Sequence, residues 1–328
     1  MVVFGQVVLG TPGAGKTTYC KAMEALLTTL KRKPIVINLD PANENIPYKC
    51  TGNIVDLMSL VERKRAETHV KAPELGPNGT VIYCAETLER NIIWLEQIIK
   101  AHLDSYVIFD CPGQVELYTH HKSLSAVFDR LQAKFDMRLC AVHLVDSVCC
   151  TDPAIFMSAM LVSLTGMLHL SLPHVNVLSK VDLLKGYGPL PFDLEFYMDG
   201  FGLQYLADAV SSSGKFGERY ADLTGSIAQV VEDFSLVSFA LLTLSDSEKG
   251  LASARDLLRT IDKSNGYGFM DIEDDDITIF DVAAGLIPEE DEVHLREVIE
   301  HFQAPPPPIE DDDDEDDGNS DVKGEGTN

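Results

Sequence analysis

A chain of 328 residues, 45% of them hydrophobic, can fill the core of one large α/β domain or of two small ones. Its formal net charge of −26 argues against direct binding to nucleic acid or to an anionic membrane, because both attract basic surfaces. No run approaches ~18 consecutive apolar residues, residues 1–9 lack the features of a signal peptide, and the seven cysteines are irregularly spaced, so we expect a cytoplasmic protein with reduced thiols.

Short apolar runs alternate with helical patterns along most of the chain. Runs without polar alternation predict parallel strands that are covered on both faces, and they span residues 7–9, 35–37, 106–109, 139–145, 175–178 and 236–239. Helical spacing predicts crossover helices over 17–31 and 85–103. In sheets of this kind ligands bind at the carboxyl ends of the strands, so the residues after each run are candidates for a site.

The first predicted strand is followed by a glycine-rich octapeptide of the pattern G-x-x-x-x-G-K-[ST], which also opens a predicted helix. Its backbone N–H groups would surround the α- and β-phosphates of a nucleotide, Lys16 would reach the β- and γ-phosphates, and Thr17 would hold Mg²⁺. The predicted phosphate-binding residues are Gly10, Pro12, Gly13, Ala14, Gly15, Lys16, Thr17 and Thr18. The motif predicts a P-loop NTPase fold, an α/β doubly wound, mostly parallel sheet with helices on both faces.

Carboxylates follow the second and third predicted strands. Asp40 lies in the run Leu39-Asp40-Pro41-Ala42-Asn43, and Asp110 ends the strand over 106–109. Together with Thr17 they suit a divalent metal that keeps several waters. Asp40 has an alternative role as the cap of a turn before Pro41.

The segment after Asp110 carries groups that could act on a γ-phosphate. The backbone N–H of Gly113 could sense this phosphate, and Gln114 or Glu116 could position the attacking water. Phosphoryl transfer needs alignment and charge neutralisation more than covalent chemistry, which makes these residue types suitable.

The fifth predicted strand ends in Ser179-Lys180-Val181-Asp182, which is close to the N-K-x-D signature that reads guanine. Asp182 can accept hydrogen bonds from the ring N–H and the exocyclic amine of guanine, a donor pair that adenine lacks. The aliphatic stem of Lys180 can cover the base, and Ser179 replaces the usual Asn. A further base-contacting loop is expected near Leu241-Leu242-Thr243 from chain order alone.

A Gly76-Pro77-Asn78 segment is inserted between the second and third predicted strands, where by itself it predicts only a type II turn. Together, the phosphate loop, L-D-P-A-N, G-P-N, D-x-P-G-Q-x-E and S-K-x-D resemble, in order and spacing, the GPN-loop GTPases. The resemblance covers about residues 3–265, and the stretches 76–86, 109–121 and 174–184 are most similar to the GPN-loop GTPase 2 group. Thr80 departs from the family pattern, which often has a second glycine there.

The resemblance implies a GTPase that binds GTP or GDP with Mg²⁺ and forms a homodimer, or a heterodimer with a GPN-loop paralogue. In such a dimer Gly76, Pro77 and Asn78 would reach the partner's γ-phosphate region, while Asp40, Asp110, Gln114 and Glu116 match the family's metal and water-positioning residues. The resemblance further implies a role in assembly or nuclear import of RNA polymerase complexes, with polymerase subunits or assembly factors as partners and shuttling between cytoplasm and nucleus.

Two other functions remain open from the sequence. One is a nucleotide-bound assembly scaffold that turns over slowly. The other is an ATP-dependent P-loop kinase or ATPase. The motif Ser179-Lys180-Val181-Asp182 argues against ATP, and a kinase would also need an arginine-bearing lid, for which the region after the fifth strand offers only Lys185, Lys215 and Arg219.

The C-terminal part of the chain has a different composition. Residues 310–328 hold ten acidic residues against Lys323 alone, and four prolines, 305–308, precede them. Such a block cannot bury enough apolar area to order itself. We therefore expect a P-loop GTPase domain over 1–265, with the G-P-N insertion at about 66–84, and a largely disordered acidic extension over 266–328 that either keeps the protein soluble or docks a basic partner.

Overall fold

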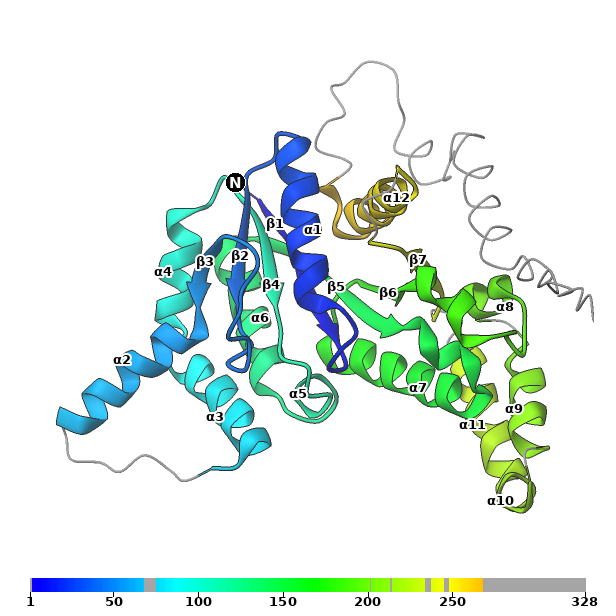
Figure 1. Cartoon of the computed structure of the whole chain (residues 1–328). Helices are drawn as coiled ribbons and strands as arrows, with labels where there is room; N and C mark the ends of the chain where they lie inside the picture. The colour runs from blue at the N-terminus through cyan, green and yellow to red at the C-terminus, as the bar shows by residue number, and fades with distance from the viewer. Residues whose placement is uncertain are drawn as a thin grey trace, which may run out of the picture.

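A computed structural model of the chain describes residues 2–67, 75–200, 202–212, 214–233, 237–244 and 248–267. Within them, seven parallel strands form one sheet in the order β3-β2-β4-β1-β5-β6-β7 (Figure 1). The strands are β1 Val3–Gly10, β2 Pro34–Asn38, β3 Cys50–Asn53, β4 Tyr106–Asp110, β5 Met137–Asp146, β6 His174–Ser179 and β7 Phe239–Leu242. The predicted α/β doubly wound sheet is confirmed, and every strand pair is parallel.

The helices connect successive strands. The α-helices are α1 Lys16–Thr29, α2 Ile54–Glu67, α3 Pro77–Arg90, α4 Ile93–Ala101, α5 Glu116–Thr119, α6 Ser123–Phe135, α7 Pro153–Leu170, α8 Leu194–Asp199, α9 Leu203–Ser211, α10 Lys215–Arg219, α11 Ala221–Asp233 and α12 Glu248–Asn265. Two 3₁₀ helices, η1 Ser147–Thr151 and η2 Val181–Tyr187, follow β5 and β6.

Helices cover both faces of the sheet (Figure 1). α1 and α12 pack on one face, where Val8 and Leu257 belong to the same buried cluster. α3, α4 and α6 pack on the other face, with Val7 and Leu88 in a second cluster. α7, α9 and α11 form a third cluster beside β6 and β7. Because alternate side chains of a strand point to opposite faces, neighbouring residues such as Val7 and Val8 separate into different clusters.

The central position of β1 decides where the first motif emerges. β1 pairs with β4 on one side and with β5 on the other, so that Val8 lies opposite Asp110 and Gly10 lies opposite Leu144. All eight residues of β1 are buried, as expected for a strand covered on both faces. The loop after Gly10 therefore leaves the middle of the carboxyl edge, between the ends of β4 and β5.

Three elements differ from the sequence-based expectation. The helix predicted over 85–103 is two helices, because Asn91 ends α3 with non-helical backbone angles (φ −114, ψ 34) and its side-chain Nδ2 donates to Thr87 O at 2.8 Å. The strand predicted over 236–239 is β7, Phe239–Leu242, and residue 236 lies outside the described residues. No apolar run predicts β3, whose sequence is Cys-Thr-Gly-Asn.

Helix α7 is strongly apolar over its length, although Ser158, Ser163 and Thr165 interrupt its apolar residues. Its 18 residues have a mean hydropathy of 1.6, and by length and composition alone it is the one helix in the described part of the chain that could span a bilayer. Phe156, Met160 and Leu164 are nevertheless buried in the cluster beside β6 and β7. Asp152 caps the helix by accepting from Ala154 N at 2.7 Å. Packing against the sheet explains the apolar composition on the buried side.

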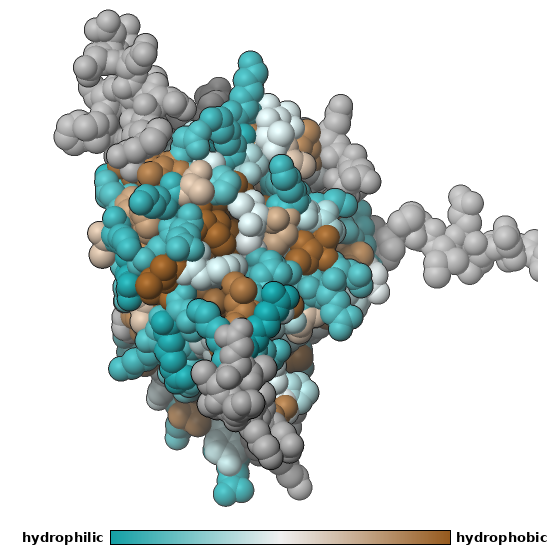
Figure 2. Space-filling view, turned by 90° about the vertical axis from the view of Figure 1, so that its left-hand side faces the viewer, coloured by the Kyte–Doolittle hydropathy of each residue, from teal (hydrophilic) through white to brown (hydrophobic). Residues whose placement is uncertain are grey.

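One side of the domain has a surface of mixed polarity (Figure 2). Figure 2 shows the side that carries α2 and α4, where hydrophobic residues are interspersed among hydrophilic ones. The exposed large apolar side chains of these two helices are Val55, Leu60 and Ile93. Tyr267, assigned by the sequence to the extension, packs in the domain with its ring 5.0 Å from that of Phe4. The rest of the expected extension, 268–328, lies outside the described residues, as do residues 68–74 of the insertion.

Candidate functional site

A cavity of about 450 Å³ opens at the carboxyl edge of the sheet. The residues that line it come from the phosphate loop, the segment after β2 and the segment after β4: Pro12, Gly13, Gly15, Lys16, Thr17, Thr18, Asp40, Ala42, Asn43, Gly113 and Gln114. The structure thus brings three of the sequence-predicted motifs to one place, as expected for strand ends that meet at one edge of a parallel sheet.

The backbone of the phosphate loop requires glycine. Gly13 and Gly15 have φ angles of 83° and 94°, which side chains rarely adopt, and Gly15 is the residue before α1. At Gly10 a Cβ would lie 2.3 Å from Leu144 O, because β1 and β5 approach closely there. The loop consequently turns tightly and delivers the N-terminal end of α1, with its free N–H groups, to the cavity.

Lys16 is held in the cavity without a carboxylate partner at hydrogen-bond distance among the described residues. Its Nζ donates to Thr11 O at 3.1 Å, and the residue is only 7% exposed. Burial lowers the pKa of Lys16, while the negative charges of Asp110 and Asp40 oppose that shift. A phosphate group would supply the compensating charge that this ammonium lacks.

Asp110 meets Thr17, which lines the cavity, at the end of β4. Thr17 Oγ1 donates to Asp110 Oδ2 at 3.0 Å, and Asn43 Nδ2 donates to Thr17 Oγ1 at 3.3 Å. The other carboxylate oxygen, Asp110 Oδ1, is buried and has no hydrogen-bond partner among the described residues. Burial raises the pKa of Asp110, whereas hydrogen bonds from Tyr48 and Thr17 and the charge of Lys16 lower it. Asp110 Oδ1 is therefore an oxygen that a metal ion or one of its waters could use.

Asp40 lines the same cavity and also fulfils the alternative role expected for it. Its Oδ1 accepts from Ala42 N at 2.9 Å, which fixes the turn after β2. Asn38, fully buried at the end of β2, supports this turn by donating from Nδ2 to Asp40 O at 2.9 Å. The side chain of Asp40 therefore serves the turn and faces the cavity at once.

These oxygen groups fit a magnesium ion. Thr17 and Asp110 supply a hydroxyl and a buried, partnerless carboxylate oxygen, and Asp40 lies at the rim. The described residues contain no cluster of three or more His, Cys, Asp and Glu side chains. A site with few protein ligands is what Mg²⁺ uses when it also binds phosphate oxygens and waters.

The segment after β4 brings Gly113 and Gln114 to the cavity but not Glu116. A Cβ on Gly113 would lie 3.0 Å from Lys16 Nζ and 3.0 Å from the Pro12 nitrogen, so a larger residue would press against the phosphate loop. Gln114 Oε1 is buried and has no partner among the described residues. Glu116 is exposed in α5 and is not among the residues that line the cavity.

The segment Ser179 to Asp182 lies beside the phosphate loop. Ser179 Oγ is within hydrogen-bond distance of two carbonyls, Ala14 O at 2.8 Å and Val145 O at 3.1 Å. Lys180 adopts a left-handed conformation (φ 60°), and its Nζ pairs with Asp146 Oδ2 at 2.7 Å. Asp182 is exposed in the first turn of η2. The serine that replaces asparagine therefore still ties this segment to the phosphate loop.

The Gly76-Pro77-Asn78 segment is not the type II turn that its sequence predicts. Gly76 precedes α3, Pro77 is its first residue, and Thr80 N donates to Gly76 O at 2.9 Å. Proline suits this position because the first helical N–H has no intrahelical acceptor. Asn78 is accordingly helical, which contradicts the left-handed conformation that a type II turn requires at this position. The three residues are exposed and do not line the cavity of their own chain.

The expected further base-contacting loop is only partly described. Leu241 and Leu242 lie inside β7 and are buried, and Thr243 N donates to Ser253 Oγ at 3.3 Å. Residues 245–247 lie outside the described residues. A base contact by this segment stays a prediction.

Sequence reasoning missed Asn43, Tyr48 and Asp146 as site residues. Tyr48 OH donates to Asp110 Oδ2 at 2.8 Å, although no pattern in the sequence links the two. Asp146 was open to prediction, because it directly ends the strand β5, whose carboxyl end lies at the same edge. Asn43 belongs to the L-D-P-A-N run but carries no local signal for its contact with Thr17.

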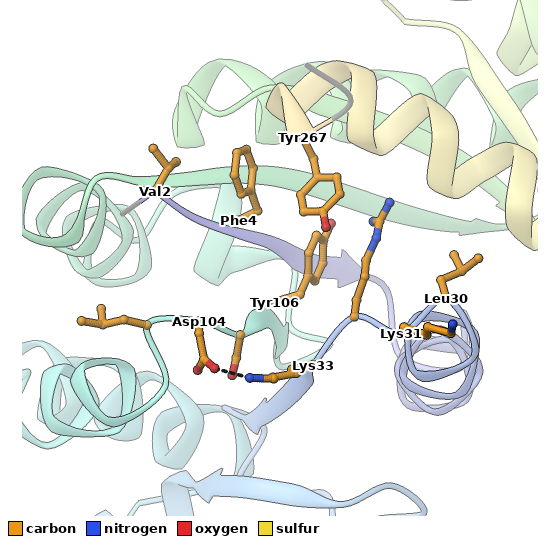
Figure 3. Close-up of a pocket in the computed structure, with 11 residues that line it drawn as sticks. Val2, Phe4, Leu30, Lys31, Lys33, Asp104, Tyr106 and Tyr267 are labelled. Carbon is orange, nitrogen blue, oxygen red and sulfur yellow. Dashed lines mark hydrogen bonds and ion pairs between the residues drawn. The ribbon is translucent and has the colours of Figure 1, made fainter. Parts of the chain in front are cut away.

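A second, larger cavity of about 660 Å³ lies at the amino edge of the sheet (Figure 3). It is lined by Val2, Phe4, Leu30, Lys31, Arg32, Lys33, Leu103, Asp104, Ser105, Tyr106 and Tyr267. Lys33 pairs with Asp104, and Arg32 donates to both carboxylate oxygens of Asp262, at 3.0 and 2.7 Å. The Arg32 guanidinium also lies 3.9 Å from the ring centroid of Tyr267.

Comparison with known proteins decides the family. The family described as "conserved hypothetical ATP binding protein" matches residues 8–267. GPN-loop GTPase 2 of Danio rerio is 49% identical over 271 residues, 83% of each chain. The chain belongs to the GPN-loop GTPase family. Another member, GPN-loop GTPase QQT1 of Arabidopsis thaliana, is 46% identical over an alignment that covers 87% of this chain and 92% of the Arabidopsis protein. GPN-loop GTPase 2 of Saccharomyces cerevisiae is 41% identical.

A solved structure supports the fold of this GPN-loop GTPase. The apo form of a GTPase from Pyrococcus abyssi superposes with a TM-score of 0.58 at 20% identity, over 82% of this chain and 98% of the other. At that identity the similarity shows the fold alone. The matching family is described as ATP-binding, whereas the similar proteins are named GTPases. The residues around Asp182 must therefore decide which base is bound.

Proposed function

We propose that this protein binds GTP with Mg²⁺ and hydrolyses it to GDP and phosphate. The observation that carries the proposal is the cavity at the carboxyl edge, which the phosphate loop, Asp40 and Gln114 line. Gln114 Oε1 has no partner among the described residues, and neither has Oδ1 of Asp110, whose Oδ2 accepts from Thr17 of the cavity lining. Membership of the GPN-loop GTPase family supports the same reaction.

Each residue would perform a distinct task. Lys16 and the loop N–H groups would bind the phosphates, and Mg²⁺, held by Thr17 and Asp110, would supply charge neutralisation on the phosphate oxygens. Gln114 Oε1 would accept a hydrogen bond from the attacking water and align it with the γ-phosphate. Asp182 would accept from the ring N–H and amine of guanine, and the exposed position of its carboxylate leaves it accessible to a base.

Competition titration tests the base. With a fluorescent GDP analogue bound, GDP and GTP should compete at least about a hundredfold better than ADP and ATP, because adenine would leave the Asp182 carboxylate without its donors. Asp182→Asn should shift the preference toward xanthine nucleotides. Equal competition by ATP would contradict the guanine assignment and favour the ATPase alternative.

Turnover of the purified protein separates the GTPase from a slowly turning-over scaffold. Gln114→Leu should retain GTP affinity and lose hydrolysis, because its acceptor is assigned to the water and not to the bound phosphates. A loss of affinity that matches the loss of turnover would show that this division of roles is wrong.

The active unit is proposed to be a dimer, with itself or with a paralogue, in which each chain lends Gly76, Pro77 and Asn78 to its partner. The first turn of α3 supports this proposal, because helical N–H groups without acceptors suit an anion and the segment is exposed. Replacing the three residues with alanine should preserve GDP affinity and lower turnover at least about tenfold. Mixing this variant with Lys16→Ala should restore part of the activity; no recovery would contradict the shared site.

A cellular role in the assembly or nuclear import of RNA polymerase complexes, with shuttling from the cytoplasm, is proposed from the sequence resemblance alone. Co-purification from cells, with bound proteins and nucleotide both identified, tests it. Recovery without polymerase subunits or assembly factors would argue against this role while leaving the GTPase reaction untouched.

A further inference from the structure

Tyr48 connects the loop between β2 and β3 to the proposed metal site. It lies between β2 and β3, is 8% exposed and packs in the buried cluster under α1. Its hydroxyl donates to Asp110 Oδ2 at 2.8 Å, and the same oxygen accepts from Thr17 Oγ1 at 3.0 Å. The loop, the start of α1 and the end of β4 therefore converge on one carboxylate oxygen.

The two oxygens of Asp110 are thereby given different tasks. Oδ2 is occupied by two hydroxyl donors, whereas Oδ1 is buried without a partner among the described residues. A carboxylate with one oxygen anchored in this way presents the other in a single direction.

Tyr48 also anchors the loop that supplies the rest of the cavity wall. Asp40, Ala42 and Asn43 precede it in the same loop and line the cavity, and Asn43 donates to Thr17. Contacts at Asn43 and at Tyr48 thus hold two points of the loop against the residues that would bind magnesium.

We propose that Tyr48 is a positioning residue for the divalent cation, because its hydroxyl turns Asp110 Oδ1 toward the ion and fixes the loop of Asp40 and Asn43 against it. The inference rests on the proposed magnesium-dependent nucleotide binding. It assigns Tyr48 no contact with the nucleotide and no proton transfer. Removal of the hydroxyl should therefore affect binding of the cation before it affects binding of the nucleotide.

Release of a fluorescent GDP analogue from the full-length protein tests the proposal, measured in EDTA and over a series of Mg²⁺ concentrations. In the wild type, Mg²⁺ should slow release with a defined midpoint. Tyr48→Phe keeps the ring and should raise the midpoint about 10- to 100-fold, the usual cost of losing a group that orients a metal ligand. The release rate in EDTA should stay within about twofold.

A matched control is Tyr19→Phe. Tyr19 is a fully buried tyrosine of α1 whose hydroxyl donates to Gln6 Oε1 at 2.7 Å, away from the cavity lining. This variant should leave the Mg²⁺ midpoint unchanged. Mn²⁺ binding to the GDP complex, followed by electron paramagnetic resonance, gives a second readout and should weaken for Tyr48→Phe alone.

The possible failures are distinguishable. Release from the wild type that does not respond to Mg²⁺ would overturn the proposed magnesium site itself. A normal wild-type response with the same midpoint for Tyr48→Phe would overturn the role of Tyr48. If Tyr48→Phe accelerated release of the GDP analogue by the same factor in EDTA and in Mg²⁺, the role of Tyr48 would also be overturned, because that outcome indicates general loosening of the loop.

Discussion

The two edges of the sheet each carry a cavity lined by charged side chains, and the larger one is not the one that gathers the nucleotide motifs. At the amino edge, around about 660 Å³, Arg32 pairs with Asp262 and Lys33 with Asp104. At the carboxyl edge, around about 450 Å³, Asp110 Oδ1 and Gln114 Oε1 have no partner in the part of the chain that the structure describes. The carboxyl-edge cavity is therefore distinguished by the nucleotide motifs and by these two acceptors beside them, not by its volume.

Helix α1 joins the two edges. It begins at Lys16 in the carboxyl-edge cavity, and the residues that follow its last turn, Leu30 to Lys33, line the amino-edge cavity. The helix thus presents its N-terminus to the proposed phosphate site, while Arg32 attaches the chain after it to α12 through Asp262. We therefore expect changes at one edge to alter binding and changes at the other to alter stability.

The largest expected effect is on binding, from Lys16→Ala. Loss of the buried ammonium should weaken GDP binding about 10²- to 10³-fold, because a charged partner of the phosphates is removed from a low-dielectric site. The thermal unfolding midpoint without nucleotide should not fall, since Lys16 makes no ion pair with Asp110 or Asp40 that would be broken. A fluorescence titration and a melting curve measure both, and a strong fall in the midpoint would contradict the assignment of Lys16 to binding.

Arg32→Ala should show the opposite pattern. Arg32 and Asp262 are mostly buried, with side-chain exposures of 18% and 11%, so removing one partner should cost about 2–3 kcal/mol of unfolding free energy. GDP affinity of the folded protein should stay within about twofold. Denaturant unfolding without nucleotide measures the loss. If Arg32→Ala had wild-type stability and weakened GDP binding, the assignment of stability to the amino edge and of binding to the carboxyl edge would be wrong.

Ser179→Ala should have a smaller effect at the carboxyl edge. Its hydroxyl lies 2.8 Å from Ala14 O and 3.1 Å from Val145 O, and its loss should loosen the attachment of the base-reading segment to the phosphate loop. One neutral hydrogen bond corresponds to about a tenfold loss of GTP affinity at most. Ser179→Asn restores the N-K-x-D pattern and serves as the comparison. An unchanged affinity for Ser179→Ala would show that this tie is dispensable.

Lys33→Ala should have the smallest effect. Lys33 and Asp104 are exposed at 71% and 52%, and an ion pair in water contributes little to stability. Neither the melting temperature nor the GDP affinity should change measurably. A clear change in the melting temperature or in the GDP affinity would mean that the residues of the amino-edge cavity have a role beyond the attachment of α1 to α12.

Particular residues show why the site is partly readable from sequence. Lys16, Thr17, Asp40 and Asp110 were placed together by two local signals, the phosphate-loop pattern and a carboxylate at the end of an apolar run, combined with the rule that parallel strands end at one edge. Tyr48 shows the limit, because its partner Asp110 is 62 residues away and the contact depends on how the loop before β3 packs.

The Gly76-Pro77-Asn78 segment shows a second limit. Its composition is typical of a type II turn, but the same residues also suit the start of a helix, where proline loses no hydrogen bond. Val81, Cys84 and Leu88 of α3 are buried in the hydrophobic cluster on one face of the sheet, and this burial favours the helical alternative. Local propensity could not choose between the two conformations.

The sequence by itself determined the parallel α/β architecture, the phosphate loop, the family and the edge of the sheet at which the polar residues gather. These follow from local patterns and from periodicity, which a linear sequence records directly. The tertiary structure alone decided which acceptors have no partner among the described residues, that Asp146 pairs with Lys180, that Tyr48 holds Asp110, and that Arg32 and Lys33 of the larger cavity form ion pairs. The physical reason is that hydrogen bonds and burial between distant segments depend on tertiary packing. Such packing produces no periodic pattern in the amino-acid sequence.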